Sequence, residues 1–350
     1  MKKIIIVFLF LFFLLLLFFL PIFFRNNFLI KKLGEGVPKP KPLMVYSFQN
    51  LQKTKFPKNQ ITLGRLVEEN PDFLSQMFYF SVPEKPGSDK MKKVSGLLNV
   101  PTKPGEYPVL IMFRGFAPKE IFFSGIGTSP SAKIFTQNGF ITLAPDFLGF
   151  GESDAPSENG FEDRFQTYLT ALTLLSSLET LNTGLEASYS GEIKADDKKV
   201  GVWGHSNGGQ IALSVLAISG LSYPTVLWAP VSKSFPYSIL YYTDEFDDQG
   251  KSLRKFLAGF EEEYDTELFS PPNYYEWIKA SLEIHQGASD QEVPVWWSDE
   301  LVDLLKKDNI EVNYIVHPNS DHNLRPDGWN GAVLQSLEFY KKHFNNTGEL

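Results

Sequence analysis

The chain of 350 residues contains no cysteine. That absence excludes disulfides, a thiol nucleophile, cysteine-ligated zinc, iron–sulfur clusters and a lipidated N-terminal cysteine. Positive charge is also scarce, because 33 Lys and Arg face 41 Asp and Glu, for a net charge of -8. No Lys/Arg cluster with interleaved aromatic residues occurs, so a nucleic-acid partner is disfavoured. With 43% hydrophobic residues the composition is that of a globular protein.

The N-terminus holds one long apolar run. Ile4–Phe24 comprises 21 uncharged residues, almost all of them aliphatic or Phe. As a helix the run would span roughly 30 Å, the hydrocarbon thickness of a bilayer. It is longer than a usual signal-peptide core and no A-x-A cleavage signature follows, so residues 1–24 are expected to be an uncleaved membrane anchor rather than a removed signal. We expect the bulk of the chain outside the cytoplasm, although the flanking charges balance: Lys2 and Lys3 before the run, and Arg25, Lys31 and Lys32 after it.

Four further segments follow the apolar run. Residues 25–42 are expected to be a Pro/Gly linker, since the stretch from Gly34 to Pro42 reads GEGVPKPKP. Residues 43–77 have weak periodicity and are expected to lie on the domain as an N-terminal extension. Residues 78–350 form the main domain. Within it, residues 233–280 are acidic and aromatic, and we expect a helical insertion that caps a pocket.

Strands and helices alternate along the main domain. Apolar runs such as PVLIMF are typical of strands buried on both faces. This alternation predicts a mainly parallel sheet covered by helices, an α/β fold. The predicted helices are 131–138, 161–182, 208–219, 300–307 and 329–343. The predicted strands are Phe78–Val82, Val94–Val100, Pro108–Phe113, Phe140–Ala144, Val200–Trp203, Thr225–Trp228, Leu282–His285 and Val312–Val316.

The sharpest local signal is the sequence GHSNGG from Gly204 to Gly209, which matches G-x-S-x-G between a predicted strand and a predicted helix. In that context Ser206 would sit on a strained turn, with its hydroxyl held out at the carboxyl end of the sheet. The N–H of Asn207 would point toward a developing oxyanion. An ordinary Gly-rich turn is the alternative, but the strand–turn–helix context favours a serine nucleophile.

A serine nucleophile needs a general base, and the chain has five histidines. His322 lies in a polar loop after the last predicted strand, from which it can reach back to the serine. We therefore assign it as the base, with His317 in reserve. His205 adjoins the serine on a tight turn, His285 lies inside a predicted strand, and His343 lies on the final helix.

The base needs an acid to orient it, and the acid is expected after a strand between serine and histidine. Asp290, in the loop that follows the strand Leu282–His285, is our choice. Glu292 and Asp321 remain competitors. The chain order Ser206, Asp290, His322 differs from the orders of chymotrypsin and subtilisin.

A second oxyanion donor is expected in the loop after the first buried strand, which reads RGFA from Arg114. Gly115 permits close approach of the backbone, so the N–H of Phe116 is the candidate donor. Arg114 has two open interpretations, as a group that binds a substrate carboxylate or as a structural residue.

Five segments together resemble an α/β-hydrolase, and within that group the catalytic domain of the prolyl oligopeptidase family, which includes acylaminoacyl and dipeptidyl peptidases. They read VLIMFRGF, ITLAPDFLGFGESD, VGVWGHSNGG, IHQGASDQEVP and PNSDHNL. The resemblance implies that Ser206, Asp290 and His322 are nucleophile, acid and base, and that Phe116 and Asn207 line the oxyanion hole. It implies structural roles for Asp146 and the GFGES turn.

Two departures from that family affect substrate choice. Fewer than a hundred residues precede the catalytic region, with no blade repeat, whereas prolyl oligopeptidases carry a β-propeller there. No tyrosine is present at 114–116, although some members use one in the oxyanion hole. We therefore expect a membrane-anchored serine peptidase acting on small peptides, with a carboxylesterase on small acyl esters as the alternative. A non-catalytic binding module is a minor alternative, and no metal or cofactor is expected.

Overall fold

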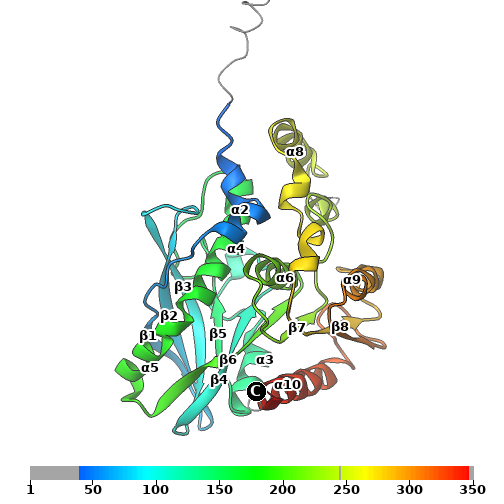
Figure 1. The fold of residues 1–350 in the computed structure, drawn as a ribbon. Helices are drawn as coiled ribbons and strands as arrows, with labels where there is room; N and C mark the ends of the chain where they lie inside the picture. The colour runs from blue at the N-terminus through cyan, green and yellow to red at the C-terminus, as the bar shows by residue number, and fades with distance from the viewer. Residues whose placement is uncertain (1–38, 244–245, 347–350) are drawn as a thin grey trace, which may run out of the picture. The chain divides into compact units, whose positions relative to one another are not determined.

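A nine-stranded sheet runs through the part of the chain that the computed structural model describes, residues 39–243 and 246–346. Its strand order is β1-β2-β3-β5-β4-β6-β7-β8-β9 (Figure 1). The strands are β1 (Thr62–Glu69), β2 (Phe73–Pro83), β3 (Met91–Pro101), β4 (Gly105–Phe113), β5 (Ile141–Pro145), β6 (Ile193–His205), β7 (Thr225–Trp228), β8 (Leu282–Gly287) and β9 (Val312–His317).

The sheet is parallel from β5 to β9 in its spatial order and antiparallel at the other edge. Strands β5, β4, β6, β7, β8 and β9 pair in parallel, whereas β1, β2 and β3 join them through antiparallel ladders. The carboxyl ends of the parallel strands therefore share one edge of the sheet, where α/β folds place their active sites. The expected α/β-hydrolase architecture, a mainly parallel sheet flanked by helices, is confirmed.

The sheet begins earlier than we expected. Strand β1 and the first residues of β2 fall within 43–77, so the later part of that segment contributes to the sheet rather than lying on the domain. Strand β1 was hard to recognise because it is an edge strand with mostly exposed residues and two irregularities in its register with β2. Only the start of the segment lies on the domain: η1 (Pro42–Tyr46) and α2 (Phe48–Lys53) bury Leu43, Tyr46, Phe48 and Leu51.

Helices cover both faces of the sheet (Figure 1). Apolar residues alternate along β4: Val109 and Ile111 join the core that contains α4, α5, α6 and α9, whereas Leu110 and Met112 join the core beneath α3 and α10. The helices are α3 (Ser129–Gln137), α4 (Gly160–Ser177), α5 (Leu181–Tyr189), α6 (Asn207–Ser219), α9 (Val295–Lys307) and α10 (Trp329–Asn346). A 3₁₀ turn, η3 (Leu178–Thr180), divides the single helix expected over 161–182.

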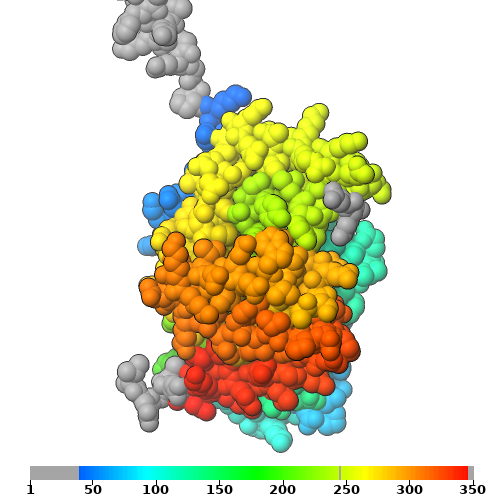
Figure 2. Space-filling view, turned by 90° about the vertical axis from the view of Figure 1, so that its right-hand side faces the viewer, coloured from blue at the N-terminus to red at the C-terminus, as the bar shows by residue number. Residues whose placement is uncertain are grey.

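The segment between β7 and β8 is helical. It contains α7 (Tyr237–Leu240), α8 (Lys251–Glu263), η5 (Thr266–Phe269) and η6 (Pro271–Trp277). Its aromatic residues pack onto α4: Phe256 stacks on Phe161 at 4.3 Å, and Phe269 stacks on Phe165 at 4.9 Å between ring centroids. Figure 2 shows the insertion in yellow continuing into the orange region of α9 and the red α10. Much of its aromatic content is therefore core packing.

Within residues 39–243 and 246–346, no helix is both long and apolar enough to cross a membrane. The predicted anchor at 1–24 and the linker up to residue 38 lie outside the described residues.

Candidate active site

Ser206 lies on a sharp turn between β6 and α6. Its backbone adopts φ 56° and ψ -121°, a conformation that non-glycine residues rarely take. The surrounding sheet holds this conformation in place: the Ser206 N–H donates to the carbonyl of Trp228 at 2.9 Å, and its carbonyl accepts the N–H of Val231 at 3.0 Å. The strained serine predicted from G-x-S-x-G is therefore present.

The glycines of the motif are required by close packing. A Cβ on Gly208 would lie 2.0 Å from the carbonyl oxygen of Phe113, and one on Gly204 would lie 2.6 Å from the carbonyl oxygen of Gly208. Both contacts are with backbone atoms, which cannot rotate away. Strand and helix can therefore meet at Ser206 only with glycine at these positions.

Asp290 and His322 form a hydrogen-bonded pair at the same edge of the sheet. His322 Nδ1 lies 2.9 Å from Asp290 Oδ2, and the Asp290 side chain is fully buried while that of His322 is 15% exposed. Asp290 Oδ1 accepts the N–H groups of Glu292 at 2.9 Å and Val293 at 2.8 Å. Gln286 Nε2 donates to Asp290 Oδ2 at 3.0 Å. Both oxygens of the carboxylate are thus hydrogen-bonded, which fixes its orientation toward His322.

The loops that carry acid and base are bonded to each other. The N–H of Ala288 donates to the carbonyl of His317, and the N–H of Ser289 donates to the carbonyl of Ser320, both at 2.9 Å. A Cβ on Gly287 would lie 2.4 Å or less from two carbonyl oxygens of the opposite loop. This close contact fixes Asp290 and His322 relative to each other.

The alternative acids lie elsewhere in the site. Glu292 is exposed and contributes its N–H to Asp290. Asp321 is also exposed, and its Oδ1 accepts the N–H groups of Asn323 and Arg325 at 2.8 Å, so it closes the loop around His322. Neither carboxylate has a hydrogen bond to His322 among the described residues.

The reserve base, His317, has a different partner. Its Nε2 lies 2.9 Å from Nδ1 of His285, whose Nε2 in turn lies 3.0 Å from Oε1 of the buried Glu283. Burial lowers the pKa of His317 to about 4. His285 is a core histidine with its polar atoms paired, as its position inside a strand suggested.

His205 links the nucleophile turn to the base. Its Nε2–H donates to the carbonyl of His322 at 3.0 Å, and the two rings lie 4.7 Å apart between centroids. Burial, together with the neighbouring His322, lowers the pKa of His205 to about 4, so its ring is neutral near pH 7. Within the described residues the Ser206 hydroxyl has no hydrogen bond to His322, and such bonds often tighten only when substrate binds.

The loop after β4 approaches the nucleophile closely. A Cβ on Gly115 would lie 3.0 Å from the Cβ of Ser206. Neither the N–H of the adjacent Phe116 nor that of Asn207 donates a hydrogen bond within the described residues. The Phe116 side chain itself is 83% exposed. Two N–H groups near one serine hydroxyl are what an oxyanion hole requires.

Arg114 is a structural residue, which removes its alternative role as a binding group for a substrate carboxylate. Its guanidinium donates to the carbonyls of Gly115 at 2.9 Å and Asp146 at 3.1 Å, and it lies 4.2 Å from the ring centre of Phe150. Burial lowers the Arg114 pKa to about 10. Asp146, held by the hydroxyls of Ser95 and Ser124, has a pKa raised by burial. The guanidinium therefore links the loop that contains Phe116 to the segment at Asp146 and stabilises that loop.

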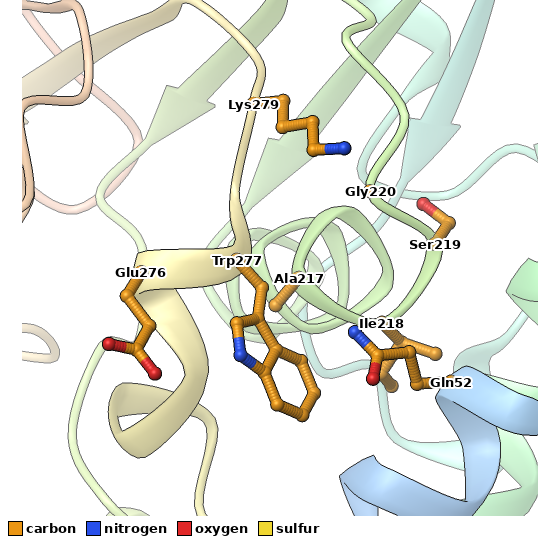
Figure 3. Close-up of a pocket in the computed structure, with 8 residues that line it drawn as sticks. All are labelled: Gln52, Ala217, Ile218, Ser219, Gly220, Glu276, Trp277 and Lys279. Atoms are coloured by element: carbon orange, nitrogen blue, oxygen red, sulfur yellow. The ribbon is translucent and has the colours of Figure 1, made fainter.

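One cavity of the described residues does not adjoin the candidate triad. It has a volume of about 370 Å³ and lies at the far end of α6, between α2 and η6. Figure 3 shows Lys279 directed toward Gly220, whereas Glu276 points away from the other lining residues. Because α6 has 13 residues, this end lies roughly 20 Å from Ser206. A smaller cavity of about 170 Å³ adjoins His205, Trp203 and Trp329.

Some members of the site gave no sequence signal. Gln286 lies inside β8, yet its buried amide also bonds the carbonyl of Val293 and the hydroxyl of Ser298, so it shapes the acid loop. The contact between His205 and His322 was also missed, because it joins residues 117 positions apart.

A strained serine, a buried Asp–His pair and a nearby loop with free N–H groups define a serine hydrolase on an α/β sheet. Residues 128–347, more than half of the chain, match the prolyl oligopeptidase family. The chain belongs to that family, as the resemblance indicated, and is an enzyme of the serine hydrolase class.

Individual relatives are distant. An uncharacterized peptidase of Bacillus subtilis (strain 168), YtmA, is 23% identical over 261 residues, covering 71% of this chain and 89% of that protein. A probable dipeptidyl peptidase 4 of Aspergillus flavus is 26% identical over 84% of this chain. The matched region covers only 37% of that protein. An acetyl xylan esterase from Paenibacillus sp. R4 has a TM-score of 0.57 at 15% identity, covering 87% of this chain and 95% of that chain. The last likeness concerns the fold alone.

Proposed function

We propose that this chain is a membrane-anchored serine peptidase of the prolyl oligopeptidase type, with Ser206 as nucleophile, His322 as base and Asp290 as the orienting acid. The observation that carries the proposal is the buried Asp290–His322 pair, 2.9 Å apart, at the same sheet edge as the strained Ser206. The pairing through Nδ1 leaves the Nε2 of His322 for the serine proton.

The proposed reaction is acyl transfer to water. His322 Nε2 takes the proton of the Ser206 hydroxyl while the serine oxygen bonds to the substrate carbonyl carbon. The N–H groups of Phe116 and Asn207 stabilise the oxyanion, where one donor is typically worth roughly 3–4 kcal/mol. His322 returns the proton to the leaving group as its bond breaks. Water then repeats these steps on the acyl-enzyme and releases the acid, with Asp290 balancing the charge on His322.

An apolar cluster lies beside the nucleophile, and it favours substrates that carry an apolar group next to the scissile carbonyl. Val231, Val293 and Trp297 are buried together, with Tyr242 against them. Val231 bonds the Ser206 carbonyl and Val293 bonds the Asp290 carboxylate, so the cluster touches both halves of the site. Tyr241 packs on Trp297 at 4.8 Å between centroids and is 37% exposed.

A carboxylesterase acting on small acyl esters is the second candidate. The observation that favours it is the loop at 114–116, where the exposed Phe116 side chain provides no hydroxyl to the oxyanion. Two N–H donors can serve both ester and amide cleavage, but the ester, with its better leaving group, depends less on any further donor.

One comparison tests both candidates. We would measure kcat/KM of the full chain in detergent for aminoacyl anilides and for short-chain aryl esters. Ser206→Ala is the catalytic blank, and Ser219→Ala, at the far end of α6, is the matched control. Anilide cleavage lost only in Ser206→Ala supports the peptidase. Cleavage of esters without cleavage of anilides supports the esterase proposal instead. Activity that survives Ser206→Ala contradicts both the peptidase and the esterase proposals.

The membrane anchor rests on the sequence of residues 4–24. We expect the full chain to remain in the membrane pellet after carbonate extraction and to begin at its own N-terminus. A chain recovered in the supernatant, with a new N-terminus after residue 24, would instead identify a removed signal peptide.

A further inference from the structure

Arg164 is the fifth residue of α4 and is bonded to the helix of the nucleophile. Its Nη2 donates to the side-chain oxygen of Gln210. Gln210 is buried, and its Nε2 donates to the carbonyl of Lys233 at 3.2 Å. Gln210 follows Ser206 by one helical turn, so the α-carbons of the two residues are roughly 6 Å apart. The guanidinium is therefore bonded to a buried residue that lies one helical turn from the nucleophile.

The guanidinium is only partly satisfied. Arg164 is partly buried, and no carboxylate oxygen lies within 4 Å of it in the described part of the chain. A neutral amide oxygen takes one of its five N–H donors. Partly buried arginines normally find carboxylate partners, because desolvating an unpaired cation costs free energy.

Nearby charged groups are already engaged or face elsewhere. Glu162 accepts hydrogen bonds from Tyr46 at 3.1 Å and Ser157 at 2.7 Å. Lys233 pairs with Glu300. Among residues 39–243 and 246–346, these pairings leave Arg164 as a cation without a carboxylate in contact.

Asp163 precedes Arg164 on α4. Adjacent positions on a helix do not face each other. Burial raises the Asp163 pKa, and the nearby positive charge of Lys119 opposes that shift. Asp163 forms no ion pair with Arg164 among the described residues.

We propose that Arg164 binds a carboxylate on the acyl part of the substrate. The enzyme would then prefer esters or amides whose acyl group carries a negative charge beyond the residue next to the scissile carbonyl. Gln210 orients the guanidinium, and the N–H groups not bonded to Gln210 meet the two oxygens of the incoming carboxylate. This inference rests on the proposed function of Ser206.

The test uses two substrates that differ in one group. N-succinyl-alanyl aryl ester carries a carboxylate, and its succinamoyl counterpart carries a neutral amide of the same shape. We expect the full chain to prefer the carboxylate substrate by about 10- to 100-fold in kcat/KM, the range of a charged hydrogen-bonded pair. Arg164→Gln should remove this preference and leave the activity on the neutral substrate within about twofold.

Two controls keep the outcomes distinct. Arg65→Gln removes an exposed positive charge that pairs with Glu152, and it should preserve the preference. Arg164→Lys should restore part of the preference, since it keeps the charge without the planar fork. No Ser206-dependent cleavage of either substrate would overturn the proposed function itself. Cleavage of both without a carboxylate preference, or a preference that survives Arg164→Gln, would overturn the inference alone.

Discussion

Replacing Asp290 by Asn tests the assignment of the acid most directly. The asparagine must keep an oxygen toward the two backbone N–H groups that Asp290 Oδ1 accepts. Its amide NH₂ then occupies the position of Oδ2, facing Nδ1 of His322 at about 2.9 Å and the Nε2 donor of Gln286 at 3.0 Å. Because an NH₂ group donates, His322 Nδ1 would have to accept a hydrogen bond instead of donating one. His322 would therefore adopt the tautomer that carries its proton on Nε2.

A histidine protonated at Nε2 cannot accept the proton of Ser206. The imidazolium that forms during the reaction also loses the carboxylate charge. Together these losses are expected to lower kcat by about 10⁴-fold, or roughly 5 kcal/mol. The assay is kcat on an aryl ester under saturating substrate, with thermal unfolding measured in parallel to show that the protein is folded.

Asp321→Asn is the matched control. It makes the same chemical change one position from His322, and its oxygen can keep the hydrogen bonds from Asn323 and Arg325. We expect its kcat to stay within about threefold of the unmodified protein. If Asp321→Asn were the inactive variant and Asp290→Asn kept more than a tenth of the activity, the reasoning from hydrogen-bond geometry would be refuted.

Two further variants test the oxyanion loop and the buried histidines. Gly115→Ala places a Cβ 3.0 Å from the Cβ of Ser206, so we expect the loop to shift and kcat to fall about 10- to 100-fold, while Gly331→Ala, which meets no atom within 4 Å, leaves kcat unchanged. His317 has a pKa of about 4 in the folded chain against 6.5 unfolded, so its contribution to stability is complete above pH 6.5 and is lost as pH falls toward 4. His317→Gln should reduce the slope of the unfolding free energy in that window by up to about 1.4 kcal/mol per pH unit, measured by urea titration; an unchanged slope would contradict the lowered pKa.

The sequence was most informative where a residue's role depends on its own neighbours in the chain. Apolar runs located β4 and β7, and the motif around Ser206 located the nucleophile turn, because steric strain at one serine requires glycine on either side. Strand β1 was missed, since an edge strand that is largely exposed lacks the apolar periodicity of a buried one.

Contacts between residues far apart in the chain were harder to predict from the sequence. Arg114 left two interpretations open, and only its bonds to Gly115 and Asp146 resolve them. The place of Asp290 after a strand made it the preferred acid over Glu292 and Asp321. The sequence nevertheless gave no sign that Gln286 and two backbone N–H groups would hold its carboxylate, because those bonds depend on how one loop closes.

His205 joins the nucleophile turn to the loop of the general base. Ser206 is held by β7 and the following loop, whereas Asp290 and His322 are held by each other's loops. Among the described residues, His205 connects the nucleophile turn to the base through its bond to the His322 carbonyl. His205→Phe keeps a ring against His322 but removes the donor, and we expect kcat to fall about tenfold as the base loses its alignment. Because the pKa of His205 is about 4, its ring is uncharged where the enzyme works, and the acid limb of the kcat/KM–pH profile should keep its midpoint within about half a unit. A larger shift would mean that His205 carries charge beside the base. An unchanged kcat would mean that the nucleophile and the base are aligned without it.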